Sequence, residues 1–192
     1  MDTSKLLQLI KERRSVFPNS FTGELVPRLM IDQMLESANW APTHRFTEPW
    51  RFVVFEGSGL QKFADFQAGR YKHITPPEQY SENKFEKLKN KPLKCSHIIA
   101  VCMKRDEKES VPEVEELAAV ACAIQNMLLV ASSLGVGCYL STGGVTYDEG
   151  AKEFFGLEKQ DKIIGFLNIG MANRVLGKGR RKAVEQKIRW VS

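Results

Sequence analysis

The chain has 192 residues, 43% of them hydrophobic, with 28 Lys and Arg against 23 Asp and Glu and a net charge of +5. This length can bury a core without disulfides or a structural metal, so we expect one domain over residues 1–192 and no metal site. The 4 cysteines form no Cys-x-x-Cys pair, which indicates free thiols in a reducing compartment. The N-terminal residues match neither a secretory signal nor an anchor, so we expect a cytoplasmic protein.

The predicted elements follow from hydrophobic spacing. An apolar stripe predicts a helix over Ser4 to Arg13, which places Arg13 and Arg14 at its end, where cations favour the helix dipole. A solvated helix end and a phosphate-binding site both fit these arginines. Further helices are predicted over residues 27–40, 58–71 and 148–155, and strands over 51–56, 97–103, 137–140 and 163–170.

The longest element lies between Glu109 and Gly135. Its first turn holds Pro112 and three glutamates, and the residues after it are apolar on nearly every face, so we expect a helix that is buried all round. We expect burial for Cys122 in this helix and for Cys102 in a strand. Polar residues interrupt the helix and strands flank it, so we do not expect a membrane span. Strands interleaved with helices around this core indicate an α/β or α+β protein.

Two loops carry side chains suited to a ligand. The loop after residue 39 is held by two prolines and offers flat or cationic groups to a planar anion, although an ordinary turn with an exposed His44 fits it equally. Those groups are Trp40, His44, Arg45 and Trp50. The run Ser141 to Gly144 offers hydroxyls and bare backbone N–H groups to a ring cofactor, although most such runs are turns.

The positive charge is concentrated near the C-terminus. From Arg174 to Ser192, seven basic residues stand against Glu185 alone. Such a segment can bind nucleic acid, lie on an acidic partner, or supply a cation to a bound phosphate. It lacks the interleaved aromatic residues that stack on bases, so we do not expect a nucleic-acid partner.

These stretches, in this order, resemble the nitroreductase-like FMN oxidoreductases of the short bacterial type. The likeness covers almost the whole chain and rests on a helix ending in "RRS", on "APTHRFTEPWRFVV", on the long apolar helix and on "DKIIGFLNIG" before a basic C-terminus. It implies an α+β fold with a central, mainly antiparallel sheet flanked by helices. It also implies a homodimer with the long helix at the interface and FMN between the subunits.

The resemblance further implies an enzyme that passes hydride from NAD(P)H, a transient donor, through FMN to a small-molecule acceptor such as a nitroaromatic or a quinone. The alternative is a flavin-binding or flavin-consuming protein of the same fold without nitroreductase activity. Because the cofactor carries out the chemistry, we expect no catalytic acid or base from the protein. No Gly-x-Gly-x-x-Gly fingerprint for a tightly held dinucleotide is present.

Cofactor-binding positions follow from the same resemblance. Phosphate contacts are implied for Arg13, Arg14, Ser15 and Arg181, and flavin contacts for Leu140, Ser141, Thr142 and Gly143. Trp40 and His44 are implied to reach the flavin from the partner subunit. The chain departs from the family pattern at Phe17, Phe46 and Glu48, where many members have a basic residue, Asn and Gln, so flavin contacts through those three side chains are not expected.

Overall fold

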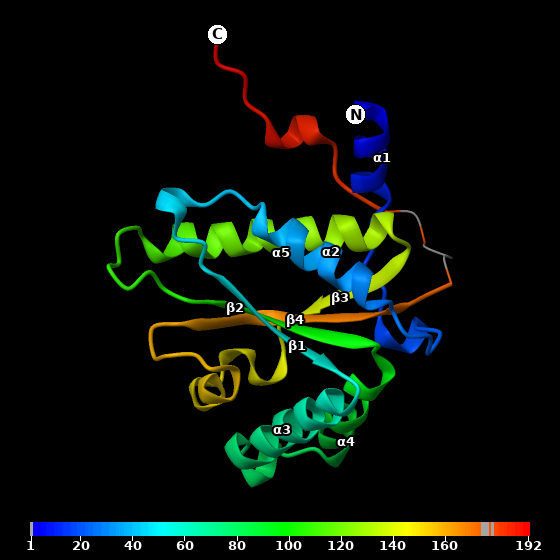
Figure 1. Ribbon diagram of the computed structural model, residues 1–192, viewed down its shortest axis with the longest axis vertical. Helices are drawn as coiled ribbons and strands as arrows, with labels where there is room; N and C mark the ends of the chain where they lie inside the picture. Colours follow the sequence, from blue (N-terminus) through cyan, green and yellow to red (C-terminus); the bar gives the residue numbers. More distant parts are fainter. Residues whose placement is uncertain (1, 174–176, 178) are drawn as a thin grey trace.

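A four-stranded antiparallel sheet forms the middle layer of the computed structural model, which describes residues 2–173, 177 and 179–192 (Figure 1). The strand order is β1-β2-β4-β3, so β1 and β3 are the edges. The strands are β1 (Trp50–Glu56), β2 (His97–Met103), β3 (Val136–Ser141) and β4 (Lys162–Met171). All three pairings are antiparallel, which confirms the predicted α+β class and sheet.

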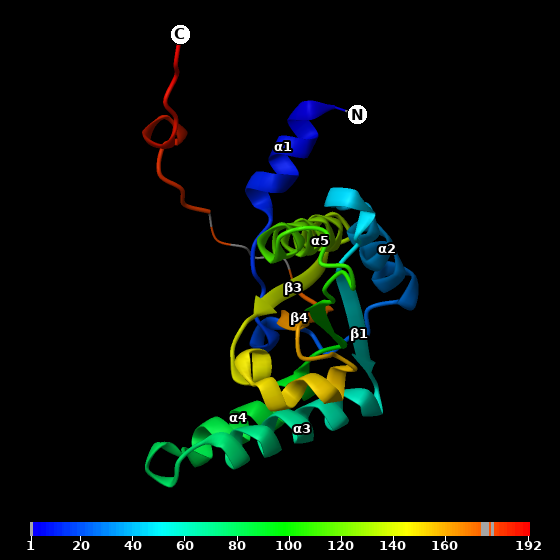
Figure 2. The same ribbon diagram turned by 90° about the vertical axis from the view of Figure 1, so that its left-hand side faces the viewer.

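Helices cover both faces of this sheet (Figure 2). One layer holds α2 (Arg28–Asn39) and α5 (Glu113–Ser133), and the other holds α3 (Ser58–Ile74) and α4 (Glu82–Asn90). Each layer buries its own apolar cluster against the sheet. Helix α1 (Thr3–Glu12) packs outside α5, and the C-terminal segment with its short helix Val184–Lys187 projects away from the sheet (Figure 1).

The burial predicted for the long helix is wrong for one side of α5. Residues such as Val120, Ala123 and Met127 are buried under the sheet and α2, whereas an outer stripe of α5 is exposed. That stripe contains Val114, Leu117, Ala118, Ala121 and Cys122. The reason is geometric, because one sheet and one neighbouring helix cover only part of a helix surface. Within the described residues α5 alone is long and apolar enough to cross a membrane, but it packs here on the sheet.

Helix α4 has no counterpart among the predicted elements. It begins after Ser81, whose hydroxyl caps the N–H of Lys84, and its sequence ENKFEKLKN carries too few apolar residues to show a helical stripe. The other predicted helices and strands are present, with ends shifted by three residues at most, although the segment near residue 150 is a 3-10 helix, Glu149–Phe155.

Candidate cofactor site

The segment that follows α1 runs beside the edge strand β3. The backbone N–H of Val16 donates to the carbonyl oxygen of Cys138 at 3.0 Å. Next to this bond, the ring of Phe17 packs on Tyr139 with 4.4 Å between the ring centroids. Successive side chains of a strand point to opposite faces, and two different cavities flank β3 accordingly.

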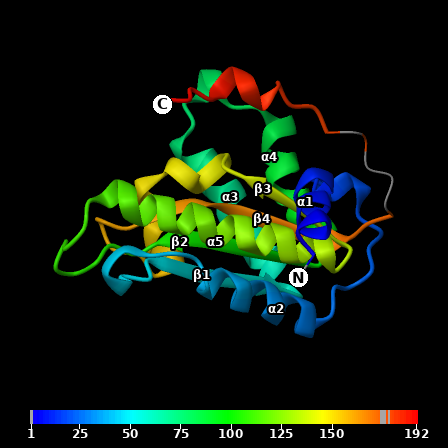
Figure 3. The ribbon, with the colours of Figure 1, turned by 90° about the horizontal axis from the view of Figure 1, so that it is seen from above.

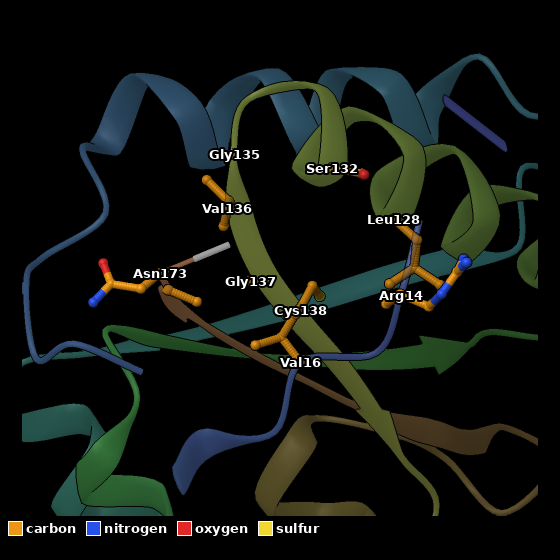
Figure 4. A pocket seen from close by; sticks show the side chains of 10 residues that line it. Arg14, Val16, Leu128, Ser132, Gly135, Val136, Gly137, Cys138 and Asn173 are labelled. Carbon is orange, nitrogen blue, oxygen red and sulfur yellow. The ribbon is translucent and has the colours of Figure 1, made fainter. Parts of the chain in front are cut away.

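The cavity on the α5 side is lined by Arg14, Val16, Leu128 and Cys138 among others, and Figure 4 shows Arg14 beside Leu128. Its volume of about 20 Å³ has room for roughly one water molecule. The Arg14 guanidinium donates to the carbonyl oxygens of Gly177 at 3.0 Å, Lys11 at 2.6 Å and Arg13 at 2.8 Å. Arg14 therefore joins the end of α1 to the C-terminal segment.

The cavity on the other side of β3 is much larger, with a volume of about 310 Å³. It lies between β3, β4 and the α3–α4 layer, and its polar lining includes Gln67, Lys87, Lys91, Ser141 and Asn168. The buried Asn168 amide donates to the carbonyl oxygen of Tyr139 and to the Ser141 hydroxyl, both at 3.1 Å. These bonds hold the end of β3 in place beside the cavity.

Of the residues predicted to approach a flavin, Ser141 and Gly143 line this cavity. Leu140 instead packs with the core on the α2–α5 side, so it can face the cavity only through its backbone, and Thr142 is exposed. Gly143 has open space where a Cβ would stand, so its bare backbone is accessible.

Sequence reasoning missed Lys91. This half-buried lysine lines the cavity, and its Nζ lies 4.9 Å from the centre of the Tyr139 ring. The lysine-rich stretch that contains α4 was assigned no element and no ligand contact from the sequence. Lys91 places a positive charge on the side of β3 where Phe17 lies. Many members of the family that the sequence resembles have a basic residue at the position of Phe17.

The loop after β3 is held by an ion pair from α3. Arg70 donates to both carboxylate oxygens of Asp148, from Nε at 2.6 Å and from Nη2 at 2.8 Å, and Gly150 N–H donates to Asp148 at 3.1 Å. The Arg70 hydrogen bonds lower the pKa of the Asp148 carboxyl below its ordinary value. The Arg70–Asp148 ion pair therefore fixes the loop that carries Gly143 and Gly144.

The other three residues predicted to contact the phosphate, Arg13, Ser15 and Arg181, lie in different places. Arg13 is half-buried and Ser15 exposed, and neither side chain has a hydrogen bond or ion pair with another residue in the described part of the chain. Arg181 lies in the C-terminal segment, which projects away from the sheet (Figure 1), and its guanidinium donates to the carbonyl oxygen of Arg180. Two other basic residues of this segment, Arg174 and Lys178, lie outside the described residues.

Trp40 and His44 lie far from Arg13 within one chain. The loop after α2, which carries both, lies at the start of α5, whereas the end of α1, which Arg13 follows, lies at the other end of α5 (Figure 3). His44 contacts Glu115 at 2.5 Å, Trp40 donates to Glu36 at 2.8 Å, and both side chains are exposed. Trp50 was expected to face a ligand, which is wrong: it is buried and donates to Asn39 at 3.2 Å.

The arrangement defines an α+β protein with a polar, cationic cavity at the end of an edge strand. Its family is shown by comparison, since the family model "Nitroreductase family" matches residues 10–171. The chain belongs to the nitroreductase family.

Named relatives agree with this family. The chain is 32% identical over 168 residues to "Putative NAD(P)H nitroreductase YfhC" of Bacillus subtilis, covering 87% of this chain and 84% of that protein. A nitroreductase-like protein of Bacillus cereus is 29% identical with a TM-score of 0.83, over 97% of this chain and 95% of the other. A Desulfovibrio desulfuricans "putative nitroreductase in complex with fmn" is 24% identical with a TM-score of 0.71, over 97% of both chains.

Proposed function

We propose that the protein is an FMN-dependent oxidoreductase that uses NAD(P)H to reduce a small acceptor such as a nitroaromatic or a quinone. The observation that carries this proposal is the cavity of about 310 Å³ beside β3, where Ser141, Asn168 and Lys91 meet the bare backbone of Gly143. Family membership and the names of the relatives support it. The proposed enzyme is one domain that acts in the cytoplasm.

The residues present fit FMN. An isoalloxazine ring needs a flat slot with hydrogen-bond donors at one edge, and the cavity combines aromatic walls, Phe63 and Phe166, with hydroxyl, amide and lysine groups. A phosphate needs cationic forks and a small donor, which Arg13 and Ser15 supply beside β3. Arg14 lines the small cavity on the α5 side, whereas Arg13 and Ser15 neither line that cavity nor make a side-chain hydrogen bond within the described residues.

Bound FMN supplies a ring that accepts hydride from the reduced nicotinamide and passes it on to the acceptor. The protein orients that ring and excludes water from it. Lys91 would favour negative charge on a bound ring through its Nζ, and the Asn168 hydrogen bond holds the Ser141 hydroxyl beside the cavity that would receive it. Neither step requires a catalytic acid or base from this chain.

A homodimer completes the proposed site. The exposed apolar stripe of α5 would be covered by the same stripe of a second copy, because a two-fold contact pairs identical surfaces. Antiparallel packing of two α5 helices brings the first residues of one helix to the last residues of the other. Trp40 and His44 of one chain then approach the last residues of the partner's α5 and the start of its β3, beside which the segment with Arg13 runs.

Reconstitution and turnover test the function. Protein refolded with excess FMN and dialysed should keep the flavin absorbance, and it should oxidise NADH or NADPH when a nitroaromatic or quinone is added. Retained flavin without turnover by either donor would favour the flavin-binding alternative. Loss of all flavin on dialysis would contradict the proposal.

Light scattering tests the dimer. At micromolar concentration we expect a mass about twice 21.8 kDa. Ala121→Glu, near the middle of α5, would place like charges together at the two-fold contact and should yield monomers with reduced FMN content. Lys89→Glu on α4 is the matched control and should remain a dimer. A monomer that binds FMN as tightly as the parent would contradict a shared site.

A further inference from the structure

A groove lies between α4 and the segment Phe17 to Asn19. It adjoins the cavity of about 310 Å³ described above, which is the candidate flavin cavity. The groove has a volume of about 540 Å³ and an apolar floor that includes Phe17 and Pro18. Three lysines line it: Lys87 on α4, Lys91 directly after α4, and Lys94 in the short 3-10 helix Pro92–Lys94. None of the three is among the residues that the sequence predicted for the site.

The groove carries net positive charge. Its one carboxylate, Glu86, is engaged by the side-chain amide of Asn90 at 2.9 Å, and Lys94 Nζ donates to Asn19 at 3.0 Å. Lys87 and Lys94 are exposed and Lys91 is half-buried. An anionic ligand therefore gains attraction here without displacing a buried ion pair, and steering by exposed lysines weakens as salt rises.

The groove and the flavin cavity share Lys87 and Lys91, so one ligand can reach from one into the other. Among the reactants of the proposed function, nitroaromatics and quinones are commonly neutral, whereas the nicotinamide dinucleotide always carries a charged pyrophosphate. A large groove with lysines at its edge and Phe17 on its floor suits a phosphate-bearing nucleotide better than a small anion.

We propose that this groove binds the phosphate-bearing part of the nicotinamide dinucleotide donor, through Lys87 and Lys94. The inference rests on the proposed function, because it assigns the donor's binding surface beside that flavin cavity. The nicotinamide ring of the donor would then lie over the flavin cavity at the end of β3.

Anaerobic stopped-flow measurement of flavin bleaching tests this proposal in the FMN-loaded protein. In Lys87→Ala, Lys94→Ala the second-order rate constant with NADPH should fall about tenfold, since each exposed charge contributes a severalfold factor. The dependence of that rate on salt should flatten in the same variant. The Lys87→Arg, Lys94→Arg variant keeps both charges and should retain most of the parent rate.

Two controls separate donor binding from other effects. Lys89→Ala removes a lysine of α4 that lines neither cavity, and it should leave the NADPH rate unchanged. The hydride donor 1-benzyl-1,4-dihydronicotinamide has no phosphate, and it should reduce the parent and Lys94→Ala, whose changed residue lies outside the flavin cavity, at equal rates, whereas NADPH should reduce Lys94→Ala severalfold more slowly than the parent.

The proposal is overturned if the NADPH rate is unchanged in the double alanine variant, or if the phosphate-free donor slows as much as NADPH in Lys94→Ala. It is also overturned if the variant loses rate only with an anionic acceptor such as 4-nitrobenzoate. Failure of the proposed function looks different, because the parent itself would then retain no FMN or would not be reduced by NADPH.

Discussion

The two sides of strand β3 differ although their residues alternate along the same six-residue strand. On the α5 side Cys138 borders a cavity of about 20 Å³, whose arginine donates three hydrogen bonds to backbone carbonyls. On the α4 side Tyr139 and Ser141 border a cavity of about 310 Å³ with lysine, amide and hydroxyl groups. The first side is packed for stability, whereas the second leaves polar groups available to a ligand.

This difference separates two neighbouring arginines. Arg14 uses its guanidinium to hold the C-terminal segment, while the Arg13 side chain makes no hydrogen bond or ion pair within the described ranges and acts on the nearby Cys138 thiol only through its charge. We propose that these adjacent arginines serve different purposes, Arg14 in the fold and Arg13 in binding the phosphate. The following experiments test that division.

The largest expected effect is on FMN affinity. Arg13→Ala removes a charge-assisted phosphate contact, which is worth about 1.5–3 kcal/mol and corresponds to an affinity ten- to a hundredfold weaker. Riboflavin lacks the phosphate, so its affinity should change little. Titration by flavin fluorescence measures both ligands, with Arg14→Ala as the matched control that keeps its preference for FMN. Equal losses of FMN and riboflavin in Arg13→Ala would assign Arg13 to the fold.

The second-largest expected effect is on stability, through the ion pair between Arg70 and Asp148. Asp148→Asn weakens the charged pair with Arg70, and we expect the free energy of unfolding at pH 7 to fall by about 2 kcal/mol. Arg70 lowers the pKa of Asp148, so the ion pair stabilises the folded parent fully above the ordinary carboxyl pKa of 3.8. This stabilisation is lost as the pH falls from 3.8 through the lowered pKa of Asp148. Urea unfolding should show a smaller difference in the free energy of unfolding between parent and variant at pH 3 than at pH 7. Asp65→Asn, on the exposed side of α3, should show no such difference.

A smaller change is expected on the α5 side. Arg14→Ala removes three hydrogen bonds from a partly exposed guanidinium and should lower the free energy of unfolding by about 1 kcal/mol. The measurement uses FMN-free protein, so that ligand binding does not contribute. An unchanged stability together with weaker FMN binding would move Arg14 to the phosphate site.

The last prediction is that the Cys138 thiol does not react with a thiol reagent in the native protein. Burial raises the pKa of Cys138 to about 12, so very little thiolate exists at pH 8. Mass spectrometry after treatment with a thiol reagent should find Cys138 unmodified in the native protein and modified in urea. Rapid native modification would show that the small cavity opens to solvent.

Much of this molecule is readable from its sequence. Every strand and most helices were predicted because alternation and helical stripes report burial against one sheet. The resemblance pointed to Arg13, Ser15, Ser141 and Gly143, whose assignment to FMN stays a prediction. Helix α4 and Lys91 were missed, because a polar helix at the surface leaves no apolar period to detect.

The sequence by itself determined the strands and most helices, which depend on local spacing, and the family with its α+β class, which depends on motifs in order. Only the tertiary structure decided which side of α5 stays exposed, that Trp50 is buried, and that Arg14 rather than Arg13 bonds to the C-terminal segment. These outcomes depend on how segments far apart in the chain pack together. Local residue patterns contain no information about which neighbour a side chain meets there.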